Sequence, residues 1–502
     1  MSEQSGQSDS GSTSTGASAL STREHDDRPA TYREIFGVRE YRAIFAAGGL
    51  SSVGDYLGKV ALAALMYQLT HSVLASAASL AITFLPWLTG APFLVALAER
   101  YPYRRVMLGC DIARMALVAL AAIPGIPIAL LPVLMFAAAM LTPPFDSSRS
   151  ALLPLVLTGD RFVLGLSLNG ITTQATQVGG YALGGAISAI NPRLALLIDA
   201  ATFGLSALLI AAYVVARPAI TSSEPRRRLL RETAEGFSVV FGSRVLRSIA
   251  VVILSGAAFA VLPEGLAAGW AHQLHGGSVT QGLIMASSPV GVVIGGVVIG
   301  RLMPPRQRRK MIRPLAMLVP LSLVGALFNP PLPVVMALTA LTGFAMSVIL
   351  PANGLFVQVL PHGYRARAFG VMQGGLQLVQ GAVMILGGEV AEELLGVSRT
   401  VGLWALIGVA LMAAIAAMWP SSEAFDQAIE RATTQNLARA AGTGAGVQSE
   451  PVNGRATERA PAHPPAPDLV PDSAPETMSR PVAEHGRSAG AVRRTRADHS
   501  QV

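Results

Sequence analysis

Twelve apolar runs that are long enough to cross a lipid bilayer constrain this sequence more than any other feature. A helix of about 20 residues crosses the hydrocarbon core of a membrane. Hydrophobic residues make up 51% of the 502 residues and charged residues only 14%, whereas about a quarter of an average soluble domain is charged. The sequence therefore predicts an all-α integral membrane protein. The expected spans are 42–67, 73–98, 105–123, 127–143, 164–189, 193–216, 247–271, 279–301, 312–329, 332–350, 366–388 and 400–419.

Polar segments divide the chain into five parts. The longest internal polar stretch separates six runs from six, which predicts two six-helix bundles. Both ends of the chain are rich in polar residues and bury too little apolar surface to fold, so they are expected to be disordered. After residue 229 the linker fits an amphipathic helix on the membrane surface, and a plain linker fits equally well. The expected parts are a cytoplasmic tail at 1–40, a bundle at 41–216, a cytoplasmic linker at 217–246, a bundle at 247–420 and a cytoplasmic tail at 421–502.

Basic residues lie almost entirely on one side of the predicted membrane. The segments on that side contain 25 Arg and Lys residues, and the opposite connections contain only Arg193 and Arg399. Because positive residues are retained in the cytoplasm, both termini are expected to be cytoplasmic. The asymmetry also explains a pI near 10 without a nucleic-acid partner. Arg greatly outnumbers Lys, and Ala and Gly are abundant, which indicates a bacterial plasma membrane.

Signatures of enzymes and metal sites are missing from the sequence. There is no H-E-x-x-H and no P-loop, and the spans contain no G-x-S-x-G elbow, which argues against a metalloprotease, an ATP-driven pump and a hydrolase. Cys110 is the single cysteine, so neither a disulfide framework nor a cysteine-based metal site is expected. We therefore expect no enzyme, no cofactor and no metal, and an ion gradient as the energy source.

The two predicted bundles repeat each other at an offset of 203 residues. Proline positions match at this offset, and so do two glutamine pairs, Gln174 with Gln377 and Gln177 with Gln380. Glutamine is scarce in membrane helices, so this register is informative. Parallel repeats of this kind are typical of alternating-access carriers, whose substrate site lies near the midplane between the repeats.

The segment FLVALAERYPYRRVML resembles the signature of the major facilitator superfamily between its second and third helices. The resemblance implies a cytoplasmic gate formed by Glu99, Arg100 and Arg104. The pieces LSSVGD, CDIAR, SRSALLP, QVGGYALGG and LIDAATFGLSALL resemble the exporter branch that includes macrolide-efflux and enterobactin-export proteins. This likeness covers about residues 38 to 420 and implies export. The arginine that many proton-coupled drug antiporters carry in the fourth helix is missing from the span 127–143.

The piece GGYALGG is similar to the glycine-rich antiporter motif of the fifth helix, with Tyr181 at the position of its usual proline. Small residues allow helices to approach closely. The expected helix-packing glycines are Gly179, Gly180, Gly184 and Gly185.

A few ionisable residues lie inside the predicted spans, where a charge is costly unless it is paired or faces a cavity. Asp55 and Lys59 share a face of the first span and are expected to form a local ion pair, which is either structural or exchanged for a proton or substrate. Glu264, in the seventh span, is a third proton-coupling candidate or a solvated residue beside Pro263. Two further acidic residues have blander interpretations. Asp111 and Arg114 form an expected structural pair, and Asp199 lies near the outer end of the sixth span, within reach of water.

Glutamines form a polar stripe along two spans. Their amides either hydrogen-bond between helices as packing contacts or line the cavity and bind polar groups of a mostly apolar substrate. The substrate-cavity candidates are Gln174, Gln177, Gln373, Gln377 and Gln380.

These observations together predict a secondary active transporter that exports a hydrophobic or amphipathic small molecule, such as a drug, an antibiotic or a siderophore-like metabolite, by proton antiport. A lysolipid or other lipid-like substrate is an alternative, and a non-transporting membrane scaffold or sensor is another. The expected partners are the small-molecule substrate, protons and membrane lipid, with no nucleic acid, and the chain is expected to act as a monomer.

Overall fold

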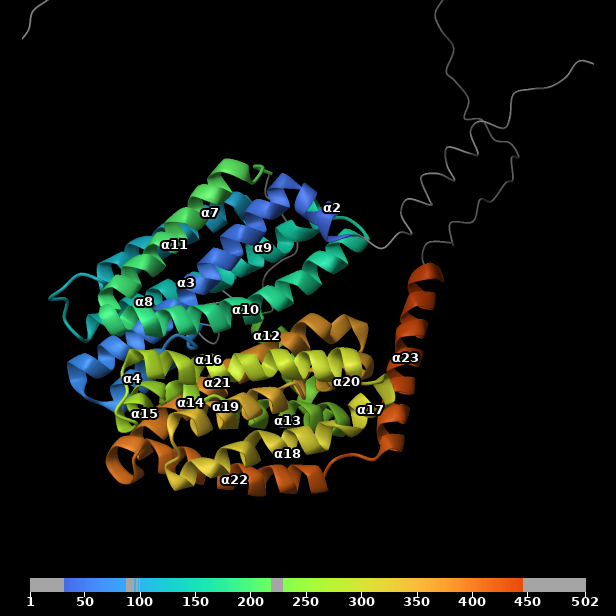
Figure 1. Cartoon of the computed structure of the whole chain (residues 1–502). Coiled ribbons are helices and arrows are strands. Elements are labelled where there is room, and N and C mark those ends of the chain that lie inside the picture. The colour runs from blue at the N-terminus through green and yellow to red at the C-terminus, as the bar shows by residue number, and fades with distance from the viewer. Residues whose placement is uncertain (1–30, 87–93, 96–97, 99, 218–228, 446–502) are drawn as a thin grey trace, which may run out of the picture. The chain divides into compact units, whose positions relative to one another are not determined.

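The computed structural model describes residues 31–86, 94–95, 98, 100–217 and 229–445, and every regular element in these residues is a helix (Figure 1). The chain through residue 444 forms one compact unit. The helices of the N-terminal half are α2 (Tyr32–Gly37), α3 (Arg39–Thr70), α4 (Val73–Ala81), α7 (Tyr103–Ala121), α8 (Leu130–Met140), α9 (Thr142–Val156), α10 (Asp160–Ile190) and α11 (Pro192–Tyr213).

The C-terminal half follows a helix of the linker, α12 (Leu229–Gly242). Its α-helices are α13 (Arg244–Ala260), α14 (Leu262–Gly265), α15 (Ala267–Gln273), α16 (Ser278–Val297), α17 (Pro305–Lys310), α18 (Ile312–Leu323), α19 (Leu332–Met346), α20 (Ile349–Val359), α21 (Arg365–Val390), α22 (Val397–Ala417) and α23 (Ser422–Ala445). Its short π and 3₁₀ turns are η1 (Val298–Leu302), η2 (Val324–Phe328), η3 (His362–Tyr364) and η4 (Ala391–Leu395).

Seven helical stretches in the described residues are long and apolar enough to cross a membrane. Two of them extend well beyond the prediction, because α9 continues α8 as far as Val156 and α20 continues α19 as far as Val359. The sequence analysis ended both spans too early, at prolines. Pro143 and Pro144 lie in the first turn of α9, where a missing N–H costs no intrahelical hydrogen bond.

Helices also occur in both segments that were predicted to be disordered tails. In α2, Ile35 is fully buried against neighbouring apolar side chains. In α23, the ring of Phe425 packs against Trp419, and Arg309 binds Asp426 with an N–O distance of 2.8 Å. The prediction of disorder was therefore wrong for 32–37 and for 422–445, because single apolar side chains anchor these segments to the bundle. Residues 1–30 and 446–502 lie outside the described residues.

Of the two alternatives for the linker, the described residues form a helix, α12. It packs against α21 and α13, and Val240 on its inner face is fully buried. Among the described residues, the ion pairs that attach the linker region to the two halves include Arg217 with Glu40 and Glu235 with Arg367.

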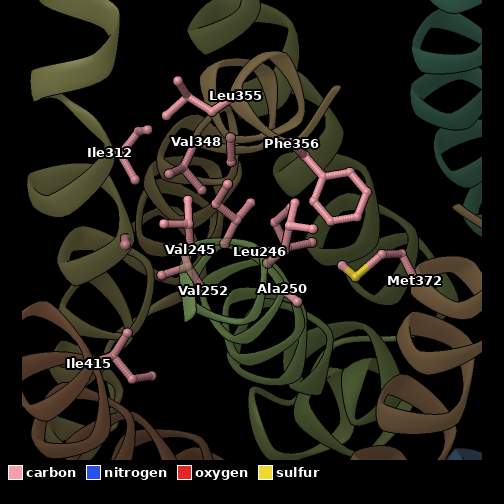
Figure 2. Packing of buried hydrophobic residues seen from close by; sticks show 14 of the residues in the cluster. Val245, Leu246, Ala250, Val252, Ile312, Val348, Leu355, Phe356, Met372 and Ile415 are labelled. Atoms are coloured by element: carbon pink, nitrogen blue, oxygen red, sulfur yellow. The ribbon is translucent and has the colours of Figure 1, made fainter. Parts of the chain in front are cut away.

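The C-terminal half has a continuous apolar core around α13. Figure 2 shows Val245, Leu246 and Ala250 of α13 facing side chains from α18, α20, α21 and α22. Burial of such side chains contributes about 1.5–3 kcal/mol each in water, and inside a bilayer close packing takes over that role.

The two halves contact each other near one end of the bundle, which we call the far end. It is the end where α3 gives way to α4 and α15 to α16; the opposite end, where α3 begins and α23 follows α22, is the terminal end. Gly185 of α10 and Gly282 of α16 meet there backbone to backbone, and Gly388 of α21 packs on Leu74 of α4. An apolar cluster that includes Trp270 joins both halves at this end.

Candidate functional site

Three charged side chains are fully buried within the N-terminal half. Asp111, Arg114 and Asp199 are 0%, 1% and 1% exposed, and they lie on α7 and α11, both of which pack closely against a neighbour in this half. No other Asp, Glu, Lys or Arg among the described residues is buried to this degree. With Asp55 of α3 they form what we call the carboxylate cluster.

Arg114 is the centre of the carboxylate cluster. Its Nη2 donates to both carboxylate oxygens of Asp55, at 2.5 and 2.6 Å. Its Nη1 donates to Ser51 Oγ at 3.3 Å and lies 3.8 Å from Asp111 Oδ1. The guanidinium carbon also lies 4.0 Å from the ring centre of Phe203, so the cation is held by carboxylates on one side and by an aromatic face on the other.

Asp111 and Asp199 complete the carboxylate cluster. Ser206 Oγ donates to Asp111 Oδ2 at 2.6 Å. The Asp199 carboxylate lies so close to Gly54 and Gly58 of α3 that a Cβ at either position would collide with it. Its Oδ1 has no hydrogen-bond partner within the described part of the chain, although Asp199 interacts electrostatically with Asp55 and Arg114. The expectation that Asp199 reaches water was therefore wrong, because two glycines let α3 cover it.

Asp55 is the accessible member of the carboxylate cluster. Its side chain is 37% exposed, whereas that of Arg114 is 2% exposed. Asp55 is therefore the member of the cluster that is not enclosed by the surrounding helices. Three carboxylates surround a single guanidinium, so the fully ionised cluster carries an excess negative charge in a poorly solvated place.

The expected ion pair between Asp55 and Lys59 is not formed. Lys59 lies one turn further along α3, with its Nζ 5.2 Å from the ring centre of Tyr56 and 5.4 Å from that of Phe84. Asp55 turns instead towards Arg114, whose Nη2 donates to both of its carboxylate oxygens and whose planar guanidinium makes a more rigid contact than a lysine on the same helix. The expected pair of Asp111 with Arg114 is present, but it is longer than the contact with Asp55.

Glu264 belongs to a second group of polar side chains, which joins the halves. The Tyr181 hydroxyl of α10 donates to Glu264 Oε1 of α14 at 2.5 Å, and the Gln177 side chain also hydrogen-bonds Tyr181. The Tyr181 ring contacts Tyr56 edge-on, with ring centres 5.2 Å apart. We call this group, from Lys59 through Tyr56 and Tyr181 to Glu264, the interhalf site.

The other glutamines take no part in these contacts. Within the described residues, four glutamine side chains make no hydrogen bond that could hold two helices together: those of Gln174, Gln373, Gln377 and Gln380. Gln373 is exposed and the other three are half-buried. These amides are therefore available to a ligand, and their predicted role stays a prediction.

Three of the four glycines in the α10 motif lie in close contacts. A Cβ at Gly180 would meet Tyr56, one at Gly184 would meet Leu57, and one at Gly185 would meet Gly282 in the other half. Gly179 differs, because nothing lies within 4 Å of a Cβ there. Its expected packing role is not seen among the described residues.

The predicted cytoplasmic gate is described only in part. Glu99 lies outside the described residues, and Arg100 is exposed. Arg104 Nη2 donates to the carbonyl of Ala211 at 2.5 Å, in the last turn of α11, where a cation stabilises a helix C-terminus. The longer fourth span adds Arg149 on α9, which packs against Gly48 of α3. A fourth-helix arginine is therefore present, beyond the point where the sequence analysis ended the span.

The sequence analysis missed several residues of the site. Tyr181 gave a signal, since it replaces the usual proline of the glycine motif. Glu392 gave none: it accepts hydrogen bonds from Ser72 Oγ at 2.6 Å and from the Leu74 backbone N–H at 2.7 Å, across the halves. Gln281, which donates to the Val60 carbonyl at 3.2 Å, was equally unmarked.

A pocket of about 200 Å³ opens between the halves at the far end. Its lining includes Tyr67, Gln68 and His71 from α3 and the residue that follows it, and His272 and Gln281 from the C-terminal half. The rings of Tyr67 and His272 lie 5.3 Å apart across the halves. The pocket is separate from the interhalf site and from the carboxylate cluster.

The sequence matches the Major Facilitator Superfamily over residues 44–319 and again over 265–445, so the chain belongs to this superfamily of membrane transporters. Its fold, which implies twelve membrane helices, is also seen in solved structures of low sequence identity. No curated protein matches the chain.

Three solved structures illustrate the likeness. A nucleoside transporter, NupG, has a TM-score of 0.59 at 15% identity and covers 76% of this chain and 100% of its own. A POT family transporter in complex with 5-aminolevulinic acid has a TM-score of 0.60 at 11% identity, covering 77% and 96%. A bacterial homologue of the lysosomal transporter Spinster has a TM-score of 0.56 at 13% identity, covering 80% and 96%. At these identities the likeness shows the fold alone.

Proposed function

We propose that this secondary active transporter exports a hydrophobic or amphipathic small molecule by proton antiport, with the carboxylate cluster as its proton-binding site. The observation that supports the proposal most is the geometry of that cluster: Asp55, Asp111 and Asp199 share one guanidinium inside the bundle. Buried charge is costly, and it is rare in membrane helices unless it serves ion or substrate movement.

Asp55 is the member that exchanges the proton. When it is ionised, Arg114 binds it with two hydrogen bonds. When Asp55 is protonated, the guanidinium loses that partner and turns towards Asp111 and Asp199, whose outer oxygens lack hydrogen bonds within the described residues. Protonation thus changes which helices Arg114 holds together, which is how a proton biases the equilibrium between two conformations.

The contacts at the far end are consistent with a carrier in a conformation that is closed on that side. Apart from the pocket described above, the far end is closed by contacts between the halves through Gly185, Tyr181 and Glu392. In an alternating-access cycle these contacts break when the protein opens on that side. Tyr181 is fully buried and donates a hydrogen bond to Glu264 across the halves, so Glu264 is the candidate that senses opening.

The direction and the membrane are inferred from the sequence. Export is supported by the resemblance of LSSVGD and its neighbouring pieces to macrolide-efflux and enterobactin-export proteins. The basic asymmetry supports cytoplasmic termini in a bacterial plasma membrane. A lysolipid or lipid-like substrate is the alternative within transport, and the apolar walls around Lys59 fit it as well.

The test is transport by purified protein in proteoliposomes with imposed pH gradients. A thermal-shift screen of macrolides, hydrophobic dyes and lysolipids first selects the compound. In the wild-type protein, an inward proton gradient should drive outward movement of that compound. Asp55→Asn, which keeps the shape of the side chain but cannot ionise, should bind the compound without coupling its movement to the proton gradient. Undiminished gradient-driven transport by Asp55→Asn contradicts the proposal and shifts attention to Glu264→Gln.

A further inference from the structure

Lys59 has a setting unlike that of any other basic residue in the spans. The chain has only two lysines, and the other, Lys310, is exposed at the end of α17. Lys59 is half-buried in the middle of α3, close to the contact between the halves. An ammonium at this depth needs a counter-charge or water.

No carboxylate supplies that counter-charge in the described structure. Every carboxylate oxygen described lies more than 4.0 Å from Lys59 Nζ, and Asp55, one turn before Lys59 on α3, is engaged by Arg114. The segment 87–97, much of which lies outside the described residues, contains no Asp or Glu in its sequence. The ammonium is instead flanked by the rings of Tyr56 and Phe84.

The surroundings of Lys59 bring both halves within reach of one ligand. Phe84 lies against Gly381 of α21, where a Cβ would be 3.8 Å from the Cβ of Phe84, next in sequence to Gln380. Tyr56 leads through Tyr181 to Gln177 on α10. A cation with aromatic walls, close to helices that carry amide side chains, suits a ligand that has an acidic group and an apolar body.

We propose that Lys59 binds the acidic group of an amphipathic anionic substrate, whose apolar part packs on Tyr56 and Phe84. The inference rests on the proposed function and specifies its substrate class. It also separates two roles within one helical turn: Asp55 exchanges the proton with Arg114 as partner, and Lys59 binds the anion. Outward movement of an anion and inward movement of a proton then use neighbouring positions on α3.

The scarcity of lysine makes the test direct. Reductive methylation with ¹³C-formaldehyde keeps the positive charge and labels only Lys59, Lys310 and the N-terminal amine. Pyrenebutyrate, its neutral methyl ester and 1-pyrenebutylamine then serve as matched probes in carbon-detected NMR titrations of the full chain. We expect the acid alone to shift the Lys59 signal in a saturable way, while the Lys310 signal stays in place.

Variants give an independent reading that needs no labelling. In a fluorescence-anisotropy titration, Lys59→Gln should weaken pyrenebutyrate binding about tenfold or more, and Lys59→Arg should retain it. Binding of the methyl ester should be the same in all three proteins. Lys310→Gln is the matched control and should change nothing.

The outcomes separate this inference from the proposed function. Equal binding of acid and ester, no saturable binding of the acid, or unchanged binding by Lys59→Gln overturns the assignment of Lys59, even if proton-driven transport is intact. If the wild-type protein binds the acid selectively but shows no proton-coupled transport, only the antiport proposal is contradicted. Repeating the titration with lysophosphatidylglycerol distinguishes a lipid anion from a soluble one. If the site binds a lipid anion, lysophosphatidylglycerol should displace pyrenebutyrate. If the site binds a soluble anion, it should not.

Discussion

The two halves of this transporter share one architecture and differ in what they bury. At the 203-residue offset, the positions of Asp55, Asp111, Arg114 and Asp199 correspond to Ala258, Pro314, Met317 and Gly402 in the C-terminal half. The buried polar side chains described in the C-terminal half are all uncharged. Around α13 its interior contains a large cluster of buried apolar side chains, part of which Figure 2 shows.

This difference indicates a division of labour between the repeats. A buried pair of charges stabilises a protein little compared with apolar side chains of the same volume, and the C-terminal half shows that the scaffold forms without them. The charges of the N-terminal half are therefore explained by function better than by stability. The C-terminal half supplies a packed partner against which the far end closes.

Removing the cation of the carboxylate cluster should have the largest effect. Arg114→Met gives the N-terminal half the residue that its repeat has at Met317, and it leaves three carboxylates without their partner. Breaking a buried pair in this way costs about 3–5 kcal/mol. Thermal unfolding and membrane abundance of the purified variant should both fall sharply.

The matched control lies in the other half. Met317→Leu conserves volume in an uncharged setting and should cost less than about 1.5 kcal/mol. If Arg114→Met is as well tolerated as this control, the buried charges are not held by Arg114, and the comparison between the halves loses its energetic basis.

Gly185 tests how tightly the halves close at the far end. A Cβ there would lie 2.7 Å from the Ser278 carbonyl oxygen and 2.8 Å from the Gly282 Cα. Overpacking costs about 1–3 kcal/mol, which shifts a conformational equilibrium about 5- to 150-fold. Gly185→Val should therefore open the far end and speed thiol labelling at Gln281→Cys, in a chain where Cys110 is replaced by Ser.

Gly179→Val is the control for Gly185, since nothing described lies within 4 Å of a Cβ at Gly179. It should leave the labelling rate unchanged. Equal effects of the two substitutions would mean that helix flexibility rather than cross-half contact explains the glycine motif.

Glu40 gives the smallest expected effect, at the terminal end. Burial acts to raise the pKa of this carboxyl, but hydrogen bonds from Arg217 and from the Val215 backbone N–H lower it overall. The lowered pKa adds stability above the unfolded value of about 4.3, and this stability is lost as pH falls through the folded value. Glu40→Gln should thus lower the free energy of unfolding at pH 7 by about 1 kcal/mol or less, which a slightly lower melting temperature would show.

The difference between wild type and Glu40→Gln should vanish in acid, once the pH falls below the lowered pKa of Glu40. Glu235→Gln, which removes the more exposed pair with Arg367, should have a smaller effect at pH 7. A gap that persists at low pH would show that the Glu40 side chain stabilises by packing.

Much of the fold follows from the sequence, because bilayer length and the basic asymmetry constrain a membrane chain strongly. The repeat and the two halves needed only apolar runs and periodicity, whereas these left a helix and a plain linker equally open between the halves. Span ends at Pro143 and Pro351 were misplaced, since a proline in the first turn of a new helix continues the rod. The carboxylate cluster was predicted only in pieces: i,i+4 spacing favoured Lys59 as the partner of Asp55, and no local rule indicates that α7 brings Arg114 nearer.

The most direct test of the central claim measures protonation of the carboxylate cluster itself. Infrared difference spectra between acidic and neutral pH, recorded on the wild-type protein, should contain a carboxylic-acid carbonyl band. Asp55→Asn should remove or shift that band, whereas Glu392→Gln at the far end should leave it in place. A band that is unchanged in Asp55→Asn would contradict the assignment of the proton-binding site to the N-terminal half.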